Sequence, residues 1–204
     1  MKILHIDCSP RDNSHSRALS SAIIGQLVEH ASQTEIVRRD LGREPLPHAF
    51  ADYAEALASP ANLNSAQAEA ATQLSEQLIQ EVEQADVVVI GTPMNNFTVP
   101  SVLKAWLDQV LRVGRTIGFS ADGDKKGLLQ DKPVYIAVAA GGVFSGERAK
   151  QPDFLTPYLT AALGCIGLTS VHYFPLQGTA FLSEEQLQDE QQQRMDDLKA
   201  ILQK

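Results

Sequence analysis

The sequence contains little cysteine, and its two thiols lie far apart. Cys8 and Cys165 are the only cysteines among 204 residues. They stand in separate apolar segments, without the spacing of a zinc site. The pattern predicts two buried free thiols rather than a disulfide. Low cysteine usage is typical of proteins in reducing compartments, so we expect a cytoplasmic location.

Histidines spaced as metal ligands are also absent, although the chain has five of them. No serine or cysteine is placed in a recognisable nucleophile–base motif. We therefore expect no essential metal and no catalytic side-chain nucleophile.

Positive charge and long apolar runs are scarce as well. The formal net charge is −8, and Lys and Arg form no cluster, which argues against a general nucleic-acid binder. No apolar run reaches the roughly 18 residues of a membrane-spanning helix. The run in "MKILHIDCSPRDN" is too short for a signal peptide. We expect neither a nucleic acid nor a membrane as partner.

Strand-like and helix-like patterns alternate along the whole chain. Apolar, β-branched runs predict strands at 3–7, 34–41, 86–91, 133–140 and 170–176. Helical periodicity predicts helices at 16–30, 66–85, 101–112, 154–168 and 183–202. Ser101 is expected to cap its helix, and "SEEQ" at Ser183 predicts a capping box.

This alternation predicts the α/β class, with one doubly wound domain spanning 1–204. Right-handed crossovers favour a flavodoxin-like five-stranded parallel sheet of order 2-1-3-4-5, with helices on both faces. Long connections at 42–65 and 113–132 lie outside these elements. Ligands of such sheets bind beyond the carboxyl ends of the strands, so the loops after the first, third and fourth strands matter most.

The loop after the first strand, "SPRDNSHSRALS", lacks both the G-x-G-x-x-G and the Walker pattern. It carries Ser9, Ser14 and Ser16 before a helix, where free N–H groups and the helix dipole favour an anion. Arg11 or Arg17 could neutralise the remaining charge. The alternative is that Ser14 or Ser16 simply caps the helix.

The loop after the third strand runs from Pro93 to Val99. Met94 and Phe97 are suited to packing against a flat ring, and Asn96 offers an amide to its edge. The alternative is a stiff turn whose asparagines hydrogen-bond their own backbone.

The loop after the fourth strand, "AAGGVFSG", contains Gly141 and Gly142. Adjacent glycines allow a ligand to approach the backbone closely, so their N–H groups could donate to a planar heterocycle. Together the three loops match the phosphate, ring face and pyrimidine edge of FMN.

These motifs resemble the FMN-dependent NADH:quinone oxidoreductases, also called azoreductases. The family pattern P-M-Y-N-F reads Pro93-Met94-Asn95-Asn96-Phe97 here, and the serine pattern reads Ser9 and Ser14-His15-Ser16. Further similarity lies in Gly141-Gly142, in "LKAWLDQVLRVGRT" and in "TPYLTAALGCIGLT". The resemblance covers essentially the whole chain.

The resemblance implies a homodimer with one FMN per subunit and active sites at the subunit interface. It implies ping-pong transfer of two electrons from NADH or NADPH through FMN to a quinone or an azo compound, and protection against electrophilic quinones. The implied cofactor-binding residues are Ser9, Arg11, Ser14, His15, Ser16, Pro93, Met94, Asn95, Asn96, Phe97, Ala139, Ala140, Gly141 and Gly142. Phe119 and Phe144 are implied for the substrate pocket.

The chain departs from the family pattern at several positions, which concern the electron acceptor and the choice of NADH or NADPH. Asn95 replaces the usual tyrosine, Phe144 stands where some relatives have histidine, and Ala139 and Ala140 replace polar or basic residues. A flavodoxin-type electron carrier without its own substrate turnover is the alternative function.

Overall fold

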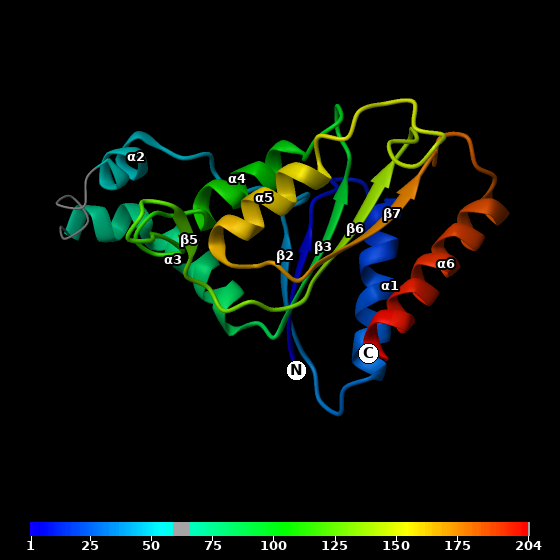
Figure 1. Cartoon of the computed structure of the whole chain (residues 1–204), viewed down its shortest axis with the longest axis horizontal. Helices are drawn as coiled ribbons and strands as arrows, with labels where there is room; N and C mark the ends of the chain where they lie inside the picture. Colours follow the sequence, from blue (N-terminus) through cyan, green and yellow to red (C-terminus); the bar gives the residue numbers. More distant parts are fainter. Residues whose placement is uncertain (59–65, 204) are drawn as a thin grey trace.

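A parallel five-stranded sheet lies at the centre of the computed structural model, which describes residues 1–58 and 66–203 (Figure 1). The strands are β1 (Lys2–Asp7), β2 (Glu35–Asp40), β3 (Val87–Pro93), β6 (Val134–Ala140) and β7 (Val171–Gln177). Their order is β2-β1-β3-β6-β7, with every neighbouring pair parallel. The predicted flavodoxin-like order is confirmed, β6 and β7 being its fourth and fifth strands.

Helices cover both faces of the sheet (Figure 1). One face carries α1 (His15–Glu29) and α6 (Glu184–Leu202), and the other carries α3 (Ala66–Gln84), α4 (Ser101–Val110) and α5 (Thr156–Ile166). The core is correspondingly split in two, with one apolar cluster on each side of the sheet. Every residue of β6 is buried, which is typical of a strand covered on both faces of its sheet.

The two long connections contain small elements that the sequence did not predict. Helix α2 (Ala51–Leu57) lies in the first connection, and the antiparallel hairpin β4 (Ile117–Phe119) and β5 (Lys125–Gly127) lies in the second. The hairpin segment packs at the C-terminal end of α5, where Leu129 N donates to Ile166 O at 3.0 Å. Because α5 runs antiparallel to the strands, the hairpin lies away from their carboxyl ends.

The two cap predictions had different outcomes. Ser183 forms the expected capping box with Gln186, in which each side chain accepts from the other residue's backbone N–H. The prediction for Ser101 is wrong, because Pro100 occupies the N-cap position and Ser101 is the first helical residue. Proline lacks an N–H and has a fixed φ, so it can end the preceding extended segment there.

The part of the chain described here, residues 1–58 and 66–203, contains no helix long and apolar enough to cross a membrane.

Candidate functional site

The loops after β1, β3 and β6 lie at one end of the sheet, since these three strands are parallel neighbours (Figure 1). Met94 N donates to Ala139 O at 2.8 Å, so the loop after β3 starts directly beside the end of β6. The strand order reverses between β1 and β3, which is the topological switch point of the sheet. This is the crevice in which doubly wound sheets bind their ligands.

The loop after β1 presents an array of free backbone donors. The first hydrogen bond of α1 runs from Ala18 N to Ser14 O at 3.0 Å. In the described structure, the N–H groups of residues 12–17 donate to no protein acceptor. Consecutive free N–H groups at a helix N-terminus form a favourable environment for a phosphate.

The serine side chains of this loop do not cap the helix. Ser14 occupies the N-cap position of α1 without a side-chain capping bond. Its Oγ lies 2.9 Å from Ser16 Oγ, which is buried. Ser14 thus holds the N-cap position, as the alternative expected, but without the side-chain bond by which a serine caps a helix. His15 is the half-buried first residue of the helix.

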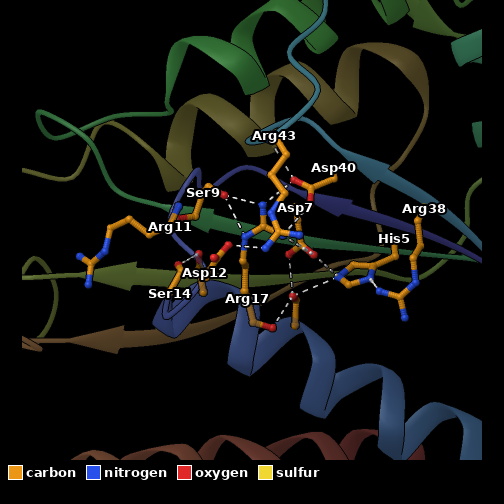
Figure 2. Close-up of polar contacts among 12 residues, drawn as sticks. His5, Asp7, Ser9, Arg11, Asp12, Ser14, Arg17, Arg38, Asp40 and Arg43 are labelled. Atoms are coloured by element: carbon orange, nitrogen blue, oxygen red, sulfur yellow. Dashed lines mark hydrogen bonds and ion pairs between the residues drawn. The ribbon is translucent and has the colours of Figure 1, made fainter.

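Arg17, on the first turn of α1, hydrogen-bonds the start of this loop and the end of β2, as Figure 2 shows. Its Nε and Nη2 donate to Ser9 O at 2.8 and 2.5 Å. Both of its terminal nitrogens bond Asp40, with Nη1 to Oδ2 at 2.8 Å. This hydrogen bond from Arg17 lowers the pKa of the Asp40 carboxyl. Arg17 is thus a structural clasp rather than a free phosphate ligand.

Arg11 is the arginine of this loop that remains available. It is exposed, and Figure 2 shows its guanidinium pointing away from the Arg17 cluster. Its backbone N–H donates to Ser9 Oγ at 3.3 Å. Of the two arginines considered as counter-charges, Arg11 therefore fits that role and Arg17 does not.

A buried polar cluster behind the clasp was not predicted from the sequence. Ser20 Oγ donates to Asp7 Oδ1 at 3.0 Å, and His5 Nε2 lies 3.2 Å from Asp7 Oδ2 (Figure 2). Arg17 Nη1 lies 3.6 Å from the same carboxylate oxygen. His5, Asp7 and Ser20 are buried, and His5 Nε2 also lies 3.1 Å from Ser20 Oγ. The cluster therefore supports the loop and offers no exposed nucleophile.

The loop after β3 is a two-residue turn with unusual backbone angles. Asn95 and Thr98 exchange backbone hydrogen bonds of 3.0 Å in both directions. Between them, Asn96 and Phe97 have φ values of 48° and 72°. Left-handed backbone is uncommon for a bulky residue, and such strain clusters at functional sites. Phe97 is also 45% exposed, so the turn presents an aromatic ring outward.

The two asparagines of this turn do not hydrogen-bond their own backbone through their side chains. No side-chain hydrogen bond of Asn95 or Asn96 occurs within residues 1–58 and 66–203. Beside them lies half-buried Met94, whose Sδ accepts a hydrogen bond of 3.2 Å from Gln151 Nε2. The amides are available to an external ligand, as the first interpretation of the loop required. Pro93 is the last residue of β3.

The loop after β6 leaves room beside Gly141, whereas a Cβ at Gly142 would overlap the side-chain amide of Gln151. Ala139 and Ala140 are buried at the end of β6, and Gly141 is exposed. A Cβ at Gly141 would have Ala180 Cβ as its nearest contact, at 3.6 Å. The N–H groups of Gly141 and Gly142 find no acceptor within the described residues. This open backbone forms a cradle that a side chain would fill.

The two aromatic residues assigned to a substrate pocket lie apart in one chain. Phe144 is buried and lines a cavity of about 600 Å³ between α5 and β7. Phe119 is 56% exposed on β4, whose hairpin lies away from the three loops. A single chain does not bring Phe119 to the loop cluster.

The two thiols differ in their burial. Burial raises the pKa of Cys8, whose thiol is fully enclosed. Cys165 is only half-buried, so the expectation of two buried thiols is wrong for that residue. Over the described ranges, His, Cys, Asp and Glu form no group of three that could hold a metal ion.

Comparison with known proteins assigns the whole chain to one family. A family model described as "Flavodoxin-like fold" matches residues 1–202. The FMN-dependent NADH:quinone oxidoreductase 4 of Pseudomonas fluorescens is 44% identical over 183 residues, which cover 89% of this chain and 86% of that protein. FMN-dependent NADH:quinone oxidoreductase 5 of Burkholderia lata is 44% identical over 182 residues, covering 87% and 85%.

Solved structures show the same fold at lower identity. An azoreductase from Bacillus anthracis str. Sterne superposes with a TM-score of 0.84 at 23% identity, covering 97% of this chain and 98% of that one. An FMN-dependent NADH-azoreductase from Bacillus anthracis str. Ames Ancestor, in complex with FMN, has a TM-score of 0.82 at 21% identity, covering 98% of both chains.

Proposed function

The chain belongs to the flavodoxin-like family that includes the FMN-dependent NADH:quinone oxidoreductases, and we propose that it catalyses two-electron reduction of quinones by NADH or NADPH through FMN. In this reaction NADH, a proton and a quinone give NAD⁺ and a hydroquinone. Cleavage of an aromatic azo bond to two amines consumes two NADH and two protons. The proposal includes a ping-pong order of the half-reactions.

One observation carries the proposal, namely the convergence of three loops, two of which carry backbone donors that lack protein acceptors. Residues 12–17 and the pair Gly141–Gly142 offer free N–H groups, and Phe97 presents a ring in strained backbone between them. These features suit the phosphate, pyrimidine edge and ring face of FMN respectively. When bound, FMN supplies the hydride chemistry, which no side chain of the site replaces.

Each loop has a separate task in this proposal. Ser9, Arg11, Ser14, His15 and Ser16 surround the phosphate, and the serine hydroxyls donate to its oxygens. In the loop after β3, Pro93 stiffens the turn, while Met94, Asn95, Asn96 and Phe97 contact the ring. In the loop after β6, Ala139 and Ala140 flank the ring, and the backbone N–H groups of Gly141 and Gly142 stabilise the charge that reduction places on the pyrimidine edge.

A homodimer is part of the proposal, because Phe119 can join the site only from a second chain. Its hairpin lies away from the loop cluster of its own chain. Paired copies would therefore complete a substrate pocket between Phe119 of one subunit and Phe144 of the other. We further propose a single FMN-binding domain over 1–204, a cytoplasmic location, and protection of cellular thiols from electrophilic quinones.

Anaerobic titration of the FMN-loaded protein tests the function. NADH or NADPH is expected to bleach the flavin with one equivalent, and a quinone is expected to restore its colour. Parallel initial-rate lines at varied NADH and quinone would support the ping-pong order. A flavodoxin-type electron carrier would bind FMN yet show no steady-state oxidation of NADH by quinones. A protein that takes up no FMN would contradict both functions.

Replacing Gly141 by valine is expected to weaken FMN binding by about 100-fold. A bulky side chain at a close-packed ligand contact costs roughly 3 kcal/mol of binding free energy. Stability should change little, because the nearest protein atom to a Cβ there lies 3.6 Å away. Fluorescence titration with FMN and urea unfolding of the FMN-free protein separate the two effects. Gly164→Val is the control, because a Cβ at this site on α5 has no atom within 4 Å apart from its chain neighbours and the backbone of its own helix. Unchanged FMN affinity in Gly141→Val would remove the pyrimidine edge from this loop.

A further inference from the structure

The segment that follows β7 binds the backbone carbonyls of the glycine loop. Gly178 N donates to Gly142 O at 3.0 Å, and Thr179 N donates to Ala140 O at 3.1 Å. Ala180 N donates to Gly141 O at 3.3 Å. Three consecutive carbonyls of the loop, those of residues 140–142, therefore face residues 178–180.

Planar peptide units turn this arrangement into an aligned set of donors. In a trans peptide the N–H points opposite to the carbonyl of the preceding residue. The N–H groups of Gly141, Gly142 and Val143 consequently point away from residues 178–180. None of these three has an acceptor among the residues that the structure describes. Val143 thus adds a donor to the glycine pair.

The side chain of Gln177 fixes the far end of the same loop. Its Oε1 accepts from Phe144 N at 3.0 Å and from Ser145 N at 3.1 Å. Its Nε2 lies 3.0 Å from Ser145 Oγ. Gln177 is the last residue of β7 and pairs in register with Ala140, so a rigid strand carries the side chain. An amide can supply both the acceptor and the donor that this clamp uses.

We propose that Gln177 is a positioning residue for the reduced cofactor, acting by holding Gly141, Gly142 and Val143 so that their N–H groups converge on one place. This inference rests on the proposed function and names residues outside the motifs that indicated it. Donors fixed in advance stabilise charge without reorganisation at the moment of reaction. Negative charge appears on the pyrimidine edge only on reduction, so the clamp stabilises reduced FMN more than oxidised FMN.

Replacing Gln177 by leucine tests the clamp through the redox potential. Loosening the donors is expected to weaken binding of reduced FMN about tenfold more than binding of oxidised FMN, which equals a fall of about 30 mV in the two-electron midpoint potential. Gln177→Met keeps the length of the side chain but removes the acceptor for the two backbone N–H groups. It is expected to lower the potential to a similar extent, and it tests the clamp if the leucine variant does not fold. Gln192→Leu, on the exposed side of α6, should leave the potential unchanged.

Amide NMR signals of the FMN-free protein report the clamp without any cofactor. In Gln177→Leu, the signals of Phe144 and Ser145 are expected to shift as their acceptor is lost. Equal weakening of oxidised and reduced FMN would reduce Gln177 to a structural role and overturn the inference. An unchanged potential in both variants would do the same. The wild type's own uptake of FMN tests the proposed function separately.

Discussion

Gly42→Ala is expected to disrupt the loop after β1, removing high-affinity FMN binding and about 3 kcal/mol or more of stability. A Cβ at Gly42 would overlap the carbonyl group of Ser9 and lie 2.8 Å from Pro10 N. Gly42 cannot retreat, because its N–H donates to Asp7 O at 3.1 Å. The backbone of Ser9 and Pro10 would have to move, and with it the N–H groups that we assign to the phosphate.

Urea unfolding of the FMN-free protein and titration with FMN measure the two losses. Gly25→Ala is the matched control, because Gly25 lies within α1 and its Cβ position has no atom within 4 Å apart from its chain neighbours and the backbone of its own helix. Alanine there should raise stability by about 0.5–1 kcal/mol through helix propensity. If Gly42→Ala matched the wild type in both assays, the close contact between Gly42 and the phosphate loop would not constrain the site.

The sheet was predictable because its interior strands carry continuous apolar runs. "DVVVIG" and "PVYIAVAA" could be read as strands covered on both faces, and the helices between them left one common topology. The hairpin β4–β5 and helix α2 escaped prediction because their strands and turns are too short to show periodicity. Boundaries at caps such as Pro100 depend on backbone angles that composition does not specify.

The candidate site was predictable to the level of loops, but its supporting contacts were not. Two features of the sequence indicated where a ligand binds. They are the loops beyond the carboxyl ends of the strands and the motif at Pro93–Phe97. The clasp of Arg17 on Asp40 joins residues far apart in the chain. Only the parallel register, which sets Asp7 beside Asp40, places two carboxylates together and calls for a cation between them. No sequence motif surrounds Gln177, because its proposed role comes from pairing of β7 with β6, which brings its side chain to the loop after β6.

Arg17→Met is expected to destabilise the protein by about 3 kcal/mol, the lower end of the cost of removing one partner from a buried ion pair. It would leave Asp40 and Asp7 without their guanidinium, and Ser9 O without two donors. FMN affinity should fall at least tenfold, since fixed donors to a charged group are worth about 1.5–3 kcal/mol each. Riboflavin affinity should stay close to that of the wild type, because riboflavin lacks the phosphate that this loop binds.

Two further variants make the comparison specific. Arg17→Lys keeps the charge but cannot bond Asp40 and Ser9 O at the same time. Its stability and FMN affinity should therefore lie between those of the wild type and Arg17→Met. Arg148→Met, at an exposed arginine, controls for the loss of one positive charge. If riboflavin and FMN weakened equally in Arg17→Met, the clasp would support the whole sheet edge rather than the phosphate loop.

The effect of Arg17→Met on stability should also depend on pH, with a sign that follows from Asp40. The hydrogen bond from Arg17 lowers the pKa of Asp40 in the folded protein. A carboxyl with a lowered folded pKa contributes stability above its unfolded pKa of about 3.9 and loses it as pH falls through the folded value. The difference in unfolding free energy between wild type and Arg17→Met should therefore be full at about pH 7 and smaller at about pH 3. A difference that grew on acidification would place the stabilising charge on another residue, because removing Arg17 would then no longer act through the ionised form of Asp40.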